Sequence, residues 1–138
     1  MLYGREHVRR YVETDGKEGH DWVRGASVLL LTTIGRRSGR PYTTPLIYQQ
    51  HGESYLVVAS NGGSDSPPDW YVNLTANPQV EMQVWGERFR ARARTAGPDE
   101  KPALWQTMAA VWPDYDAYQG RTSREIPVVI LEPTGPIS

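Results

Sequence analysis

Two adjacent arginines stand in a glycine-flanked turn, and their type and spacing suit the binding of an anion. The turn Gly35-Arg36-Arg37-Ser38-Gly39 joins two β-prone stretches. Glycines let successive backbone N–H groups converge on an anion, and two guanidinium groups with a hydroxyl complete a clamp for phosphate or carboxylate. A solvated hairpin turn with basic residues for solubility explains the same pattern, so the turn alone leaves both interpretations open.

A second pattern is an apolar stretch that ends in a small, polar, glycine-rich loop, Val58-Ala59-Ser60-Asn61-Gly62-Gly63. Such a strand end lets a flat ring lie against the backbone, with amide groups at its edge heteroatoms. An ordinary surface loop is the alternative.

The segment Asp69-Trp70-Tyr71-Val72-Asn73-Leu74 is expected to be helical, with Trp70, Asn73 and Leu74 near one face. Core packing explains the apolar members, whereas a buried Asn73 needs hydrogen-bond partners. Further along, Trp112, Tyr115 and Tyr118 recur every third residue. They suit the wall of a pocket, and a helix cap packed on a barrel mouth is the other interpretation.

Charge and composition exclude several classes of function. The 15 Lys and Arg against 16 Asp and Glu leave a net charge of −1, which argues against a general nucleic-acid binder. The alternating arginines 88, 90, 92 and 94 are interpreted as a water-facing strand surface paired with Glu on a neighbour. The absence of cysteine excludes disulfides and thiolate chemistry. No metal is expected, because His7, His20 and His51 lack ligand spacing; a surface or hydrogen-bonded structural role is expected for each.

The 138 residues suit one domain, within which residues 1–19 are expected to form an N-terminal helix or arm that is free to move. Apolar runs such as Val28–Leu31 are far too short to span a bilayer, and the first residues do not resemble a secretion signal. A cytoplasmic location is therefore expected. The amphipathic first helix adds a weaker expectation, peripheral contact with the inner face of the plasma membrane.

Hydrophobic periodicity predicts the elements that must position these residues. Strands are expected at 27–34, 42–50, 54–60, 80–84, 88–95 and 126–131, and helices at 2–13, after Pro68 and at 98–111. In the first helix, Val8, Tyr11 and Val12 are expected to form the apolar face. Strands joined as hairpins, with helices between them, predict an α+β fold that is mainly antiparallel, a small barrel with flanking helices.

Taken together, the motifs resemble one family. Leu31-Thr32-Thr33-Ile34-Gly35-Arg36-Arg37-Ser38-Gly39, Pro45-Leu46, Ala59-Ser60-Asn61-Gly62-Gly63, Trp70-Tyr71-Val72-Asn73-Leu74 and Ala76-Asn77-Pro78 occur in the order found in the deazaflavin-dependent nitroreductases. So do Tyr115 and Tyr118 ahead of Arg124-Glu125-Ile126-Pro127. These are actinobacterial reductases that use coenzyme F-420, an 8-hydroxy-5-deazaflavin. The resemblance covers residues 20 to 133.

The resemblance implies a split β-barrel of the FMN-binding type and a set of site residues. Arg36, Arg37 and Ser38 match positions that hold the phosphate and acidic tail of the cofactor. Contacts to its ring and chain are implied for Tyr42, Thr43, Thr44, Pro45, Leu46, Ile47, Val58, Ala59, Ser60, Asn61, Asp69, Trp70, Tyr71, Val72, Asn73 and Tyr115. Trp112, Tyr115 and Tyr118 match the substrate wall. The family often has Lys in place of Asn61 and Tyr in place of Trp112.

The activity implied is hydride transfer from the reduced deazaflavin to a quinone-like, enone or nitro-aromatic acceptor. Ser60, Tyr115 and Tyr118 are the candidate proton donors, and Tyr115 is the candidate for positioning the acceptor. Two alternatives stay open at this point: a barrel that binds FMN, and a non-catalytic carrier of the cofactor or of a hydrophobic ligand.

Overall fold

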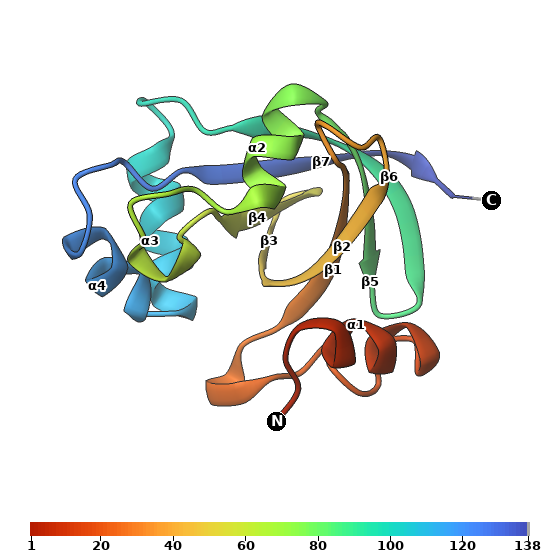
Figure 1. Ribbon diagram of the computed structural model, residues 1–138. Coiled ribbons are helices and arrows are strands. Elements are labelled where there is room, and N and C mark those ends of the chain that lie inside the picture. The colour runs from red at the N-terminus through yellow and green to blue at the C-terminus, as the bar shows by residue number, and fades with distance from the viewer. Residues whose placement is uncertain (138) are drawn as a thin grey trace.

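The computed structural model describes residues 1–137 as a curled antiparallel sheet with helices around it (Figure 1). The strands lie in the order β2-β1-β5-β6-β7-β4-β3. Consecutive strands β2 and β3 therefore form opposite edges of the sheet, which is the opening of a split barrel. The predicted fold class is confirmed. The strands are β1 (Val28–Ile34), β2 (Pro41–Ile47), β3 (Gln49–His51), β4 (Ser54–Val58), β5 (Gln79–Val84), β6 (Glu87–Thr95) and β7 (Val128–Pro136).

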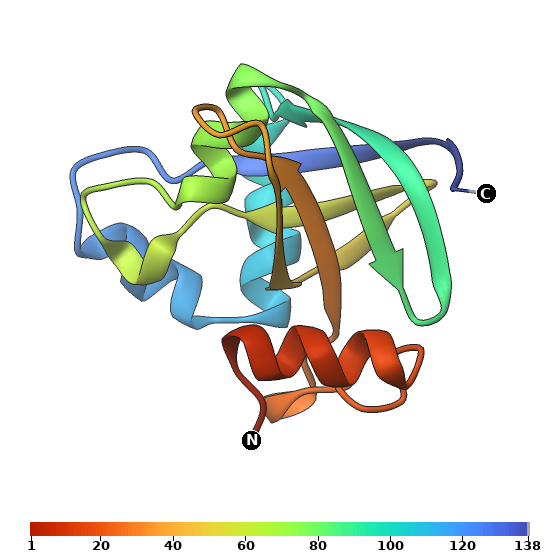
Figure 2. The same ribbon diagram turned by 45° about the vertical axis from the view of Figure 1, so that its right-hand side comes forward.

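The helices cover the ends and one side of the barrel. Helix α1 lies across one end of the curled sheet and α2 lies at the other, while α3 and α4 pack beside β4 (Figures 1 and 2). Short 3-10 turns, η1 and η2, precede β1 and follow β4. The bounds are α1 (Gly4–Glu13), η1 (Val23–Gly25), η2 (Asn61–Gly63), α2 (Asp69–Ala76), α3 (Lys101–Val111) and α4 (Asp114–Gly120).

Strand β1 is buried on both faces, as its unbroken apolar sequence predicts. Leu29 and Leu31 pack into the barrel core, whereas Val28 and Leu30 pack beneath α1 against Tyr11. Its partner β2 carries Pro45 opposite Leu30. Proline has no N–H to donate to another strand, so β2 is suited to the sheet edge where the barrel opens.

The prediction of one strand over residues 42–50 is wrong in one respect, because the strand breaks at Tyr48. The backbone N of Tyr48 donates to the oxygen of Ser27 at 3.0 Å, and its hydroxyl lies 2.7 Å from Nε2 of His20. His20 in turn bonds the Asp21 carboxylate at 2.8 Å through Nδ1 and stacks on Trp85. This network directs the chain from β2 at one edge to β3 at the other.

Two further expectations need correction. In α1 the buried side chains are His7 and Tyr11, whereas Val12 is 39% exposed, so the apolar face is rotated from the one expected. The last strand begins at Val128 instead of residue 126, because the N–H of Ile126 donates to the side chain of Gln119 at 3.0 Å.

The interpretation of the arginine strand is supported. Arginines of β6 face water, and Arg94 pairs with Glu132 on the neighbouring β7 at 3.3 Å and with Glu100 at 2.7 Å. Both buried histidines, His7 and His20, are hydrogen-bonded, and His51 is exposed. Within residues 1–137, no group of three or more metal-ligating side chains is found, nor any helix long and apolar enough to cross a bilayer.

Candidate functional site

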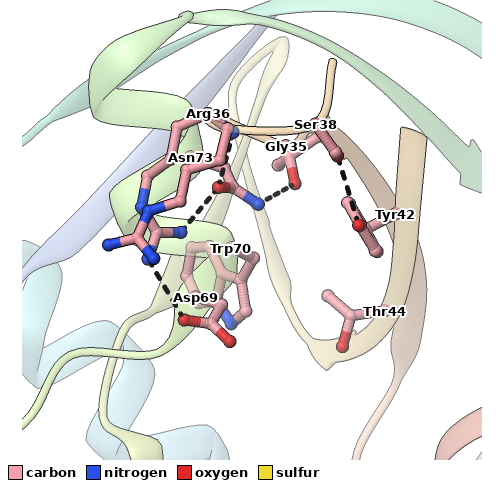
Figure 3. Close-up of a pocket in the computed structure, with 10 residues that line it drawn as sticks. Gly35, Arg36, Ser38, Tyr42, Thr44, Asp69, Trp70 and Asn73 are labelled. Carbon is pink, nitrogen blue, oxygen red and sulfur yellow. Dashed lines mark hydrogen bonds and ion pairs between the residues drawn. The ribbon is translucent and has the colours of Figure 1, made fainter. Parts of the chain in front are cut away.

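The first cavity lies between the 35–38 turn, β2 and α2, and has a volume of about 510 Å³. Figure 3 shows the side chains of β2 on one side and those of α2 on the other. Its lining residues are Thr33, Gly35, Arg36, Arg37, Ser38, Tyr42, Thr44, Asp69, Trp70 and Asn73. The arginine turn and the helix predicted after Pro68 are thus brought together at one site.

Asn73 fixes the position of Arg36 in this cavity. Its side-chain oxygen accepts hydrogen bonds from the backbone N of Arg36 at 3.2 Å and from Nη1 at 2.8 Å, and its Nδ2 donates to Thr33 at 3.4 Å (Figure 3). The guanidinium also lies 3.6 Å from Asp69. Both polar atoms of the Asn73 side chain therefore have partners within the protein, and its oxygen orients a cation.

The rest of the turn leaves cationic groups available. Arg37 and Arg40 are exposed, and neither forms an ion pair with any described residue. The Ser38 hydroxyl lies 3.2 Å from the Tyr42 hydroxyl and accepts from the backbone N of Arg40 at 3.2 Å, which shapes the turn. A Cβ at Gly35 would lie 2.6 Å from the Tyr42 ring and 2.7 Å from the Ser38 hydroxyl, so a side chain there would displace both groups.

The second cavity adjoins the first along β2, because Thr44 lines both. Its volume is about 380 Å³, and its walls are mostly aromatic and aliphatic. No Asp, Glu, Lys or Arg is among the described residues that line it. They are Tyr3, Gly4, His7, Trp22, Val28, Thr44, Pro45, Leu46, Ile47, Val58, Ser60, Gly62, Trp112, Tyr115 and Tyr118.

Tyr115 carries a free hydroxyl in this second cavity. The residue is 5% exposed, and its hydroxyl has no hydrogen-bond partner among the described residues. Every side-chain nitrogen or oxygen that is fully enclosed in this part of the chain does have such a partner. The hydroxyl is therefore open to the cavity. Burial raises the pKa of the Tyr115 phenol above its ordinary value, so the group stays protonated and able to donate.

The loop after β4 is held against α4, which fixes two walls of the second cavity relative to each other. Arg124 donates to the backbone oxygens of Ala59 at 3.2 Å, Ser60 at 2.9 Å and Ser64 at 2.8 Å. Gly63 lies so close to α4 that a Cβ would be 2.8 Å from the oxygen of Tyr118. The loop after β4 is therefore in direct contact with α4.

Several residues of the second cavity were missed by the sequence reasoning. Tyr3, Gly4, His7 and Trp22 come from the N-terminal segment, where Trp22 stacks on Trp112 at 5.9 Å between ring centroids. The Trp22 indole donates to the oxygen of Leu2 at 3.0 Å. The contact between Trp22 and Trp112 joins residues about ninety positions apart, and no local spacing in the sequence indicates it.

Five of the residues implied by the resemblance lie outside both cavities. Thr43 faces the other side of β2 and bonds Thr32 at 2.7 Å. Asn61 donates to the oxygen of Ser66 at 3.0 Å, and the Tyr71 hydroxyl lies 2.9 Å from Thr95. Ala59 is fully buried, and Val72 lines neither cavity. Strand alternation turns Thr43 away from the groove, and the helical period turns Tyr71 and Val72 away from it.

Comparison with known proteins identifies relatives of this chain. The family described as F420H(2)-dependent quinone reductase matches residues 2–133. The chain belongs to this family. A member from Mycobacterium tuberculosis, a quinone reductase dependent on reduced F-420, is 42% identical over 130 residues, which are 92% of this chain and 87% of that protein.

Solved structures agree with the assignment. A reductase described as dependent on reduced F-420 has a TM-score of 0.71 at 36% identity, covering 76% of this chain and 93% of that one. The heme storage protein HutZ of Vibrio cholerae has a TM-score of 0.58 at 17% identity, covering 96% and 92% of the two chains. That second likeness concerns the fold alone.

The residues present fit the cofactor of this family. An anionic tail needs cations, and the first cavity offers Arg36 and Arg37. A flat, largely apolar ring needs a groove without charge, and the second cavity supplies one beside it. Thr44 lies where the two environments meet.

Proposed function

We propose that this chain reduces a quinone with the hydride of reduced coenzyme F-420. The observation that carries the proposal is the pair of adjoining cavities, one cationic and the other uncharged and aromatic. Arg36, Arg37 and Ser38 hold the phosphate and acidic tail. The β2 residues 44–47 and Val58 hold the ring.

Trp112, Tyr115 and Tyr118, which line the second cavity, would hold the acceptor against the cofactor. When bound, the reduced deazaflavin supplies the hydride. The protein's part is to stack the two flat molecules, exclude water and supply a hydrogen-bond donor at the acceptor oxygen. Tyr115 is suited to that donation, because its buried hydroxyl is unpaired and stays protonated. Nitro-aromatic and enone acceptors have the same flat shape and polar edge, and the proposal includes them as further substrates.

An absorbance titration tests the cofactor, and a turnover assay tests the reaction. Purified protein is titrated with oxidised F-420 and, in parallel, with FMN. It is then mixed without air with reduced F-420 and menadione. We expect saturable binding of F-420 in preference to FMN, and rapid recovery of the oxidised F-420 absorbance once menadione is added.

Each alternative gives a different result in these assays. Preferential binding of FMN identifies an FMN barrel, and tight F-420 binding without oxidation identifies a carrier. Either result contradicts the proposal. Contact of the N-terminal segment with a membrane remains a prediction, which vesicle sedimentation tests.

A further inference from the structure

His7 is a buried residue of α1 whose ring lines the second cavity. The residue is 2% exposed, and it lies beside Trp22 with ring centroids 6.0 Å apart. Its Nε2 is 2.8 Å from the backbone oxygen of Gly19. Because a carbonyl oxygen only accepts hydrogen bonds, Nε2 carries a hydrogen and donates it.

Gly19 holds the imidazole ring in a fixed place. Its φ is +118°, and a Cβ there would lie 3.0 Å from Cδ2 of His7 and 3.1 Å from the Tyr11 ring. The backbone of Gly19 can therefore approach the imidazole edge only because that residue has no side chain. One ring nitrogen is thus anchored, and the orientation of the other follows from it.

The other ring nitrogen, Nδ1, has no hydrogen-bond partner among residues 1–137. Every side-chain nitrogen or oxygen that is fully enclosed within this part of the chain does have a partner. Nδ1 is therefore open to solvent, and the solvent-filled space that His7 lines is the second cavity. A ligand that enters the cavity can therefore take the place of water as the partner of Nδ1.

We propose that His7 is a catalytic residue for the acceptor: Nδ1 binds an acceptor oxygen and gives it a proton. This inference rests on the function proposed above. The hydride brings two electrons and one proton to the quinone, whose oxygen then carries negative charge. The Nδ1–H bond of the imidazolium breaks and the O–H bond of the hydroquinone forms. The neutral imidazole recovers its proton from solvent.

The surroundings of His7 define the class of acceptor. No Asp, Glu, Lys or Arg is among the described residues that line the second cavity, so a cationic acceptor would be desolvated there without a counter-ion. The polar groups are His7, Tyr115 and Ser60, set in aromatic and aliphatic walls. This arrangement fits a neutral, flat molecule with oxygens at its edge, such as a naphthoquinone.

Two substitutions at position 7 separate the catalytic role from a structural one. In His7→Gln the side-chain amide reaches the place of Nε2 and can still donate to Gly19, but nothing replaces Nδ1. In His7→Asn the shorter amide loses the Gly19 bond. We expect His7→Gln to keep the Tm and the F-420 affinity of the wild type. Its kcat with menadione should fall about a hundredfold, as expected for loss of a general acid.

A purely structural His7 predicts a different result for the activity of His7→Gln. His7→Gln would then keep the wild-type kcat and KM for menadione, while His7→Asn would lower the Tm, and this result overturns the inference. If the wild-type protein itself transfers no hydride to quinones, the proposed function fails as well. If the wild-type protein reduces quinones and His7→Gln is fully active, the inference about His7 is wrong but the proposed function stands.

A measurement on the unmodified protein gives a readout that does not depend on turnover. The chain has three histidines, so their ring nitrogens are resolved by ¹⁵N NMR. We expect menadione, above its KM and without cofactor, to shift Nδ1 of His7 while His20 and His51 stay unchanged. An unchanged His7 signal under these conditions overturns the inference, whether or not His7→Gln folds.

Discussion

The side-chain oxygen of Asn73 accepts two hydrogen bonds from Arg36, one from its backbone N and one from its guanidinium. The turn that follows β1 is thus tied to the middle of α2. Asn73 is 4% exposed, so its polar atoms have no water to replace these partners. The orientation of Arg36 in the first cavity and the docking of α2 therefore depend on one amide.

Replacing Asn73 by alanine should weaken both properties. Asn73→Ala leaves the backbone N of Arg36 without its acceptor, and we expect a loss of about 1–3 kcal/mol in the free energy of unfolding. The affinity for F-420 should fall because Arg36 is no longer oriented. Urea denaturation and equilibrium dialysis measure the two effects. Thr75→Ala on the exposed face of α2 is the control, and unchanged affinity in Asn73→Ala would contradict the link.

The arginine doublet should carry most of the affinity for the anionic tail. Charge-assisted hydrogen bonds contribute about 1.5–3 kcal/mol each, so Arg36→Ala with Arg37→Ala should raise the Kd for F-420 by a hundredfold or more. Arg92→Ala, on the water-facing side of β6, removes a cation outside both cavities and should leave the Kd unchanged. A double variant that binds as the wild type does would remove the clamp from the site.

Removing the Tyr115 hydroxyl should affect the reaction but not the fold. We expect Tyr115→Phe to lower kcat for quinones, or to change the preferred acceptor, while F-420 binding persists. Since the hydroxyl lacks a partner within residues 1–137, its removal should leave the Tm unchanged or raise it. Tyr71→Phe removes a hydroxyl outside both cavities and serves as the control. Wild-type acceptor kinetics in Tyr115→Phe would exclude this hydroxyl from the reaction.

Gly63 and its neighbour offer a matched pair for the contact between the loop and α4. Both have positive φ, but a Cβ at Gly63 would lie 2.8 Å from the Tyr118 oxygen, whereas one at Gly62 meets nothing within 4 Å. Gly62→Ala should cost only the backbone strain, about 1–2 kcal/mol. Gly63→Ala should cost more, because the loop is displaced from α4. Equal Tm in the two variants would argue against this coupling.

Stability should decrease at alkaline pH because of buried phenols. Burial raises the pKa of Tyr48 to about 12, while an unfolded phenol ionises near pH 10. Stability is therefore unaffected below about pH 10 and falls as the pH rises from there towards 12. Tyr11 and Tyr115 are shifted in the same direction. Urea denaturation across this range should show a shallower fall in Tyr48→Phe; an equal slope would show that Tyr48 contributes nothing.

The elements that depend on local pattern were predictable from the sequence. The apolar run Val28–Leu31 predicted a strand buried on both faces, and Gly35 to Gly39 predicted the turn that borders the first cavity. Trp112, Tyr115 and Tyr118 were expected to line a pocket, and all three lie on the second cavity. In each case the period of the element decides where its side chains point.

The features that depend on contacts between distant segments were not predictable. The break at Tyr48 results from bonds to Ser27 and His20, and the wall formed by His7 depends on how α1 docks. In α1 the pattern of Val8, Tyr11 and Val12 indicated an apolar face, but the side chain that is buried with Tyr11 is His7. A ring nitrogen bonded to Gly19 makes that burial favourable, and local hydrophobicity contains no sign of it.

The placement of the tryptophans gives this protein built-in optical reporters. Trp70 lines the first cavity, while Trp22 and Trp112 line the second; the chain has five in all. A chromophore that enters either cavity comes into contact with indole rings and quenches their emission. Occupancy of the two compartments can therefore be followed without a label, and Trp70→Phe distinguishes the signal of one compartment from that of the other.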